Sequence, residues 1–230
     1  MDKARKLRIA ALGVAIVAAI VATLLGAAYV AMRRPSPFYE QALQVDPEVM
    51  GLGNREMESR ATALYSDASK PGLWQATFTA DQINGWLATQ LAAEDSRRLP
   101  DNVSAPRVAL SGGRIALGFR TRQGGVATVV SVDAAVHLTE ENEVAVRLTS
   151  VRAGALPLPV MQVASDIAAA CRKLELPVRW TQADGQPVAL VDLSSAADAK
   201  GRRIHIDAVE LENGSLLIAG HTEELMNDER

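Results

Sequence analysis

VSAPRVALSGGRIALGFRTRQGGVATVVSVDAAVHLTEENEVAVRLTSVRA, residues 103–153, carries the clearest structural pattern of this 230-residue chain. Glycine-rich or polar breaks at 111–113, 123–125 and 140–142 divide it into four stretches. Mostly apolar residues recur within each stretch at every second position: Val108/Leu110, Ile115/Leu117/Phe119, Val126/Thr128/Val130/Val132/Ala134/Val136 and Val144/Val146/Leu148. Because alternate side chains of a strand point to opposite faces, the pattern predicts a four-stranded antiparallel meander with one buried face.

The segment before the meander, LWQATFTADQINGWLATQL at 73–91, has the start signals of a helix. Thr79 and Gln82 have the spacing of a capping box, and Phe78 and Ile83 stand where a hydrophobic staple closes over the first turn. Gly85 has no side chain, so we expect another element to approach the helix closely there.

Further elements are predicted on both sides of this region. Asp46-Pro47 has the chemistry of a helix start, and Gly51 and Gly53 are expected to break the early part of that helix. A helix with one apolar stripe is predicted at 159–174. Four more strands are predicted at 178–181, 188–193, 204–211 and 216–221, of which the last two are joined by the hairpin signal Asn213-Gly214.

The N-terminal region predicts a membrane anchor. The 24 residues from Ile9 to Met32 contain no charge, and a helix of that length exceeds a hydrocarbon core of about 30 Å. Four basic residues precede the span and two follow it, so the positive-inside rule places the N-terminus in the cytoplasm. The larger part is then extracytoplasmic, on the periplasmic side of a single-pass membrane protein.

A cleavable signal peptide is the alternative interpretation of the same region. A basic start followed by apolar residues is also typical of signal peptides, and 26–28 has the small residues of a cleavage site. The apolar run is longer than the usual h-region and ends in Arg33-Arg34, which favours a retained anchor.

The charge distribution argues against nucleic acid as a partner. Of 24 basic and 27 acidic residues, six basic and one acidic lie in 1–34, which leaves 18 and 26 in the remainder, a net charge of −8. Nucleic-acid binding needs clustered positive charge, and no basic stripe or zinc-finger spacing is present in the sequence.

No catalytic or metal-ligand motif stands out. His137, His205 and His221 are far apart in the sequence, so no metal site is predicted, and Cys171 stands alone on an apolar helix stripe. His205 and Asp207 are two residues apart on one predicted strand, which is common on exposed strand faces. Nucleophile-elbow, P-loop and dinucleotide motifs are absent, so neither an enzyme nor a cofactor is expected.

The order of elements resembles a known family. An anchor is followed by FTADQINGWLATQL, SGGRIALGF, AGALPLPVMQV and VELENGSLLIAG, an order that resembles the YpmS-like extracytoplasmic proteins across residues 74–221. Their relatives in the tubular lipid-binding superfamily wrap a curved antiparallel sheet around a long helix and leave an apolar tunnel. The resemblance implies no catalytic residue. It places on the helix faces towards the sheet a candidate apolar lining made of Ile83, Trp86, Leu87, Val160, Val163 and Ile167.

The sequence therefore predicts an α+β fold, in which an N-terminal transmembrane helix is followed by a curved antiparallel sheet packed on one or two helices. The expected organisation has five parts: a cytoplasmic stub at 1–8, the anchor at 9–32, a spacer and juxtamembrane helix at 33–72, the extracytoplasmic domain at 73–222 and an acidic tail at 223–230.

Two functions compete on this basis. In the first, the domain holds a lipid or other apolar ligand between helix and sheet. In the second, the same elements close into a solid core, and the domain is a non-enzymatic cell-envelope scaffold or adaptor with an envelope protein as partner. An enzyme with a dispersed site is a third, weaker hypothesis.

Overall fold

The computed structural model describes residues 23, 26, 30–90, 103–123, 126–140, 142–173, 177–192 and 202–224. Most of the predicted span at 9–32, residues 91–102 and 193–201, and all but the first two residues of the predicted tail at 223–230 lie outside these residues. Among the residues described, no helix combines the length and the apolar character needed to cross a membrane.

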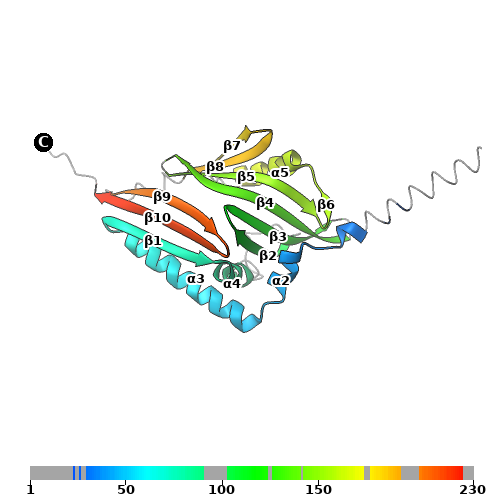
Figure 1. The fold of residues 1–230 in the computed structure, drawn as a ribbon, viewed down its shortest axis with the longest axis horizontal. Coiled ribbons are helices and arrows are strands. Elements are labelled where there is room, and N and C mark those ends of the chain that lie inside the picture. The colour runs from blue at the N-terminus through cyan, green and yellow to red at the C-terminus, as the bar shows by residue number, and fades with distance from the viewer. Residues whose placement is uncertain are drawn as a thin grey trace, which may run out of the picture.

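The fold is α+β, and its strands divide between two antiparallel sheets (Figure 1). The smaller sheet has the order β1-β10-β9, from β1 (Gly72–Thr79), β10 (Ser215–Glu224) and β9 (Arg202–Glu212). The larger sheet has the order β2-β3-β4-β5-β8-β7, and the two-residue β6 (Leu156–Pro157) pairs with β5. Its members are β2 (Val103–Ser111), β3 (Arg114–Gln123), β4 (Val126–Glu140), β5 (Glu143–Ala153), β7 (Val178–Ala183) and β8 (Gln186–Asp192).

The predicted meander is confirmed, because β2, β3, β4 and β5 are neighbours in chain order and antiparallel. The hairpin at Asn213-Gly214 is also confirmed as the connection of β9 to β10.

The single sheet of the prediction is instead divided in two, and buried asparagine side chains occupy an edge of each part. Asn84 bonds both backbone groups of Val108 in β2, at 2.7 and 2.9 Å. Asn142 bonds Ile204 and Ile206 in β9, at 2.9 and 2.8 Å. These side chains take hydrogen bonds that a further strand would otherwise make.

Helix α3 (Pro47–Ala68) starts at the predicted cap, where the Asp46 carboxylate accepts a hydrogen bond from the Glu48 backbone N–H. The expected break at Gly51 and Gly53 is wrong, because the helix runs through both. Gly53 instead lies where α3 crosses α4 (Ala80–Gln90): a Cβ there would be 2.6 Å from the Asp81 carbonyl oxygen. Tight helix packing, rather than a turn, is therefore the reason for this glycine.

The close approach predicted at Gly85 is confirmed at the same crossing. A Cβ on Gly85 would lie 2.5 Å from the Met50 carbonyl oxygen. The α4 start also matches prediction, since the Gln82 side chain accepts from the Thr79 N–H and the Thr79 hydroxyl accepts from the Gln82 N–H, at 3.0 and 3.2 Å. Figure 1 shows α3 lying along the smaller sheet, with α4 between that sheet and β2.

The main core lies between helix α5 (Val160–Lys173) and the larger sheet. Its buried members are Val132, Ala134, Leu148, Val151 and Ala164. Val160, Val163 and Ile167 pack against this cluster, so the apolar stripe of the predicted helix faces the sheet as expected.

The segment after the predicted span is part of the folded body. Helix α2 (Pro37–Leu43) places the ring of Tyr39 in complete burial, and its hydroxyl donates to the Ala105 carbonyl in β2 at 2.8 Å. Gly118 of β3 makes room for that ring, because a Cβ there would be 2.6 Å from Tyr39 Cδ2. Burial raises the pKa of Tyr39, an effect that nearby Arg120 and Arg107 partly oppose.

Candidate functional site

The six residues of the predicted apolar lining are divided between two regions. Leu87 is buried and Ile83 and Trp86 are half-buried on α4, which contacts α3, β1 and β2. Val160, Val163 and Ile167 lie on α5, which contacts β5, β7 and β8. Each set therefore meets a different part of the structure.

A shallow groove runs along α5 where the helix meets β7 and β8. It has a volume of about 300 Å³ and contains none of the six predicted residues. Trp180 forms part of its wall, and the indole Nε1 is buried with no hydrogen-bond acceptor among the described residues. The other lining residues are Met161, Ala164, Ser165, Ala168, Thr181, Gln182 and Pro187.

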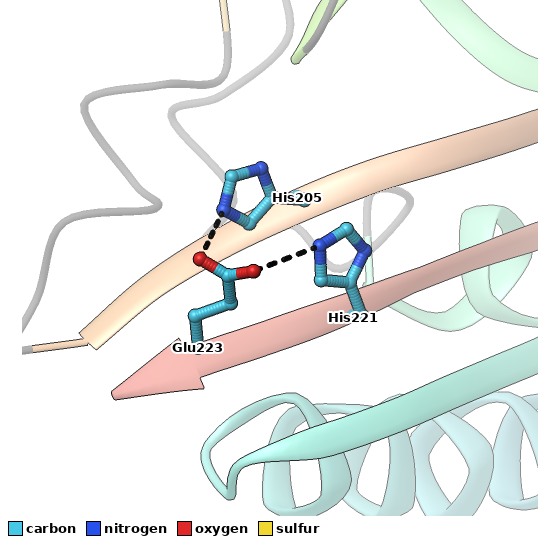
Figure 2. A group of neighbouring side chains, drawn as sticks. All are labelled: His205, His221 and Glu223. Carbon is cyan, nitrogen blue, oxygen red and sulfur yellow. Dashed lines mark ion pairs between the residues drawn. The ribbon is translucent and has the colours of Figure 1, made fainter. Parts of the chain in front are cut away.

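A second site is built from polar side chains on the β9–β10 hairpin. His205 of β9 lies directly opposite His221 of β10, and the two imidazole rings stack with centroids 4.4 Å apart and planes inclined by 3°. Glu223 is two residues beyond His221, so it lies on the same face of the strand. Figure 2 shows its carboxylate reaching towards both rings.

The distances in this cluster are short enough for direct interaction. The Nε2 atoms of His205 and His221 are 3.8 and 3.7 Å from different oxygens of the Glu223 carboxylate. The His205 side chain is only 13% exposed, whereas that of Glu223 is 63% exposed. The cluster thus has a buried wall and an open rim.

A fourth side chain orients the His221 ring. The Nδ1 atom of His221 is 2.7 Å from the Asp207 carboxylate. A carboxylate accepts hydrogen bonds, so Nδ1 carries a proton and donates it to Asp207, while Nε2 lies on the Glu223 side of the ring. Asp207 of β9 therefore pairs with His221 on the neighbouring strand.

A β-bulge brings the two histidines together. From Ser215 to Ala219, each step forward along β10 pairs with one step back along β9. Between Ala219 and Gly220 this register shifts by one residue. Without that shift His221 would pair with Ile206. Because a one-residue slip moves side chains to the other face, the extra residue Asp207 places His205 beside His221.

His205 and His221 are far apart in the sequence, and the inference that they could not form one site is wrong for this pair. His137 lies on β4 and is not part of the cluster. The available signal was the hairpin itself, since Asn213-Gly214 stands midway between the two histidines. A hairpin alone does not predict the bulge, and the bulge decides which side chains share a face.

Comparison with protein-family models, with curated proteins and with solved structures finds no match to this chain.

Proposed function

We propose that the protein is a single-span membrane-anchored extracytoplasmic adaptor. Contacts with the end of the anchor hold its body in a fixed orientation on the extracytoplasmic side of that membrane. The supporting observation is the junction between residues 30–43 and the larger sheet.

Backbone groups at the end of the apolar segment are bonded to the body. The Ala155 N–H donates to the Ala31 carbonyl at 2.9 Å, and the Thr128 hydroxyl donates to the Met32 carbonyl at 2.7 Å. The last carbonyls of a helix have few partners within the helix, so these bonds add partners from the body; the Ala31 carbonyl also accepts from the Arg34 N–H at 3.2 Å. They also join the helix end to the β4–β5 side of the sheet.

Glycine and tyrosine packing completes the junction. Gly154 is buried with a φ of +59°, and a Cβ there would be 2.5 Å from the Ala31 carbonyl oxygen. The ring of Tyr39 on α2 is fully buried against the larger sheet. The sequence from 30 to 43 is therefore packed against the body, in contrast to the flexible coil that lets tethered domains reorient.

An adaptor function follows from this rigidity together with the charge of the body. Residues 35–230 carry a net charge of −8, and the buried Asn84 and Asn142 close sheet edges against unspecific strand pairing. A body of fixed orientation presents one surface to a partner in the envelope. No reaction is needed for that function.

A ligand-binding function is the second candidate, favoured by the groove along α5. Its volume of about 300 Å³ is at the lower limit for a small-molecule pocket, and Trp180, Met161 and Pro187 contribute apolar atoms to its wall. A small apolar molecule would match it. This candidate agrees with the lipid-binding relatives that the sequence resembles.

Membrane fractionation and a topology reporter test the proposal. The full chain should stay with membranes after carbonate washing, and a reporter fused after residue 230 should be active only outside the cytoplasm. A soluble product beginning near Tyr29 would show cleavage and contradict the anchor. A cytoplasmic reporter signal would contradict the location.

Native mass spectrometry of the detergent-solubilised chain separates the two candidates. The adaptor predicts the mass of the protein alone. A bound apolar molecule that is lost in Trp180→Ala, and retained in the control Trp74→Phe, would favour ligand binding at the α5 groove.

A further inference from the structure

We propose that His205, His221 and Glu223 form a binding site for one divalent transition-metal ion of the zinc type. The proposal is independent of the adaptor function, because it rests on the β9–β10 hairpin alone. The cluster lies towards the end of β10, which Figure 1 places at the end of the smaller sheet away from α4 and α2.

The three possible donor atoms lie close to one another. One ligand atom from each of the three residues lies within 4.8 Å of the other two. A tetrahedral zinc ion with bonds of about 2.0 to 2.1 Å needs donors about 3.3 Å apart. The distances of 3.7 and 3.8 Å from Glu223 to the two histidines exceed this value, and all three donors lie within 4.8 Å of one another. A metal ion lies in the plane of each imidazole that binds it, and the two rings are stacked with planes inclined by 3°, so the His205 ring must turn out of the stack when the ion binds. Because Glu223 is largely exposed, rotation of its side chain can close the remaining difference without moving either strand.

The surroundings of His221 match those of a metal ligand. Histidines that bind metals nearly always donate their second ring nitrogen to a carboxylate or carbonyl, which fixes the tautomer and the ring orientation. Asp207 provides such a carboxylate at 2.7 Å from Nδ1. This second, independent observation distinguishes the cluster from a surface group of histidine and glutamate.

The donor set selects the class of metal. Two imidazoles and one carboxylate suit zinc, nickel or copper, whereas calcium and magnesium prefer sites made of oxygen alone. Three protein ligands leave a fourth position for water or another molecule. Arg203 lies opposite Glu223 in the sheet register, so its positive charge competes with the metal for this carboxylate.

Calorimetric titration of the purified full-length chain with Zn²⁺, without a histidine tag, tests the site. We expect one ion per chain for the unaltered protein. His205→Ala and His221→Ala should abolish binding, and Asp207→Asn should weaken it by about 10- to 100-fold because it removes the partner of Nδ1. His137→Ala is the matched control and should bind like the unaltered protein.

Two further variants keep the test decisive if a histidine substitution unfolds the chain. Glu223→Gln changes an exposed side chain, so it should retain the melting temperature while weakening zinc binding at least tenfold. Arg203→Ala should strengthen binding. Absence of saturable zinc binding by the unaltered chain, or equal loss of binding in His137→Ala, would overturn the proposal.

Discussion

At the scale of single residues, the absence of a side chain at certain glycines allows neighbouring elements to approach closely. Gly51 and Gly53 are neighbours in α3 and look equivalent in the sequence, but their surroundings differ. A Cβ at Gly53 would meet backbone atoms of α4, whereas a Cβ at Gly51 would meet only the end of the Arg55 side chain, at 3.8 Å. Backbone atoms cannot rotate away, so only Gly53 is required by the helix crossing.

We therefore expect opposite results from the same substitution at these two positions. Gly53→Ala should lower the free energy of unfolding by about 1 to 3 kcal/mol, because it overpacks the crossing. Gly51→Ala should raise it by about 0.5 to 1 kcal/mol, since alanine favours a helix interior over glycine. Urea unfolding measures both. Equal midpoints for the two variants would contradict the crossing geometry.

At the scale of elements, local capping chemistry sets where α4 begins. The reciprocal bonds between Thr79 and Gln82 satisfy two backbone donors at the helix start, and Gln82 also donates to the Glu56 carboxylate of α3 at 2.9 Å. The cap thus orients α4 against α3 as well as beginning the helix. Asn84 in the next turn then reaches the edge of β2.

Thr79→Ala should lower the free energy of unfolding by about 1 kcal/mol, because it removes the hydroxyl that accepts from the Gln82 N–H. Thr62→Ala is a suitable control: Thr62 is exposed in the middle of α3, and its hydroxyl bonds only to the Glu58 carbonyl one turn earlier. Thermal unfolding should show little change for the control. An unchanged midpoint for Thr79→Ala would remove the capping assignment.

At the scale of the whole molecule, Tyr39 connects the N-terminal segment to the larger sheet. Its hydroxyl donates to Ala105 from a fully buried position. Burial raises the pKa of Tyr39 above the ordinary value of 10.0, so the folded state disfavours the tyrosinate more than the unfolded state does. The native interaction is therefore fully present below pH 10 and is lost as pH rises through the folded-state pKa.

Alkaline unfolding should reveal this contribution. Tyr39→Phe should be less stable at neutral pH by about 1 kcal/mol, because a buried hydrogen bond is lost. Its stability should then fall less steeply than that of the unaltered protein above pH 10. Tyr65→Phe is the control, because Tyr65 is 73% exposed and should leave the pH dependence unchanged. Parallel curves for all three proteins would contradict the role of Tyr39.

Much of the secondary structure could be predicted because its causes are local. Alternating apolar residues, the Thr79–Gln82 cap and the Asn213-Gly214 turn act over a few residues, so the meander, α4 and the last hairpin were all expected. The continuity of α3 was not expected, because glycine disfavours a helix. At Gly53 this low propensity is outweighed by packing against a segment 28 residues away. Propensity describes a residue in isolation, and packing overrides it.

By itself, the amino-acid order determined the type and position of most elements and the apolar stripe of α5, since both depend on periodicity along the chain. Only the tertiary structure decided the division into two sheets, the junction at Tyr39 and the meeting of His205 with His221. Each of these depends on residues far apart in sequence or on a one-residue bulge. A shift of a single residue reverses the face on which every following side chain lies, and no local pattern near Asp207 records that shift.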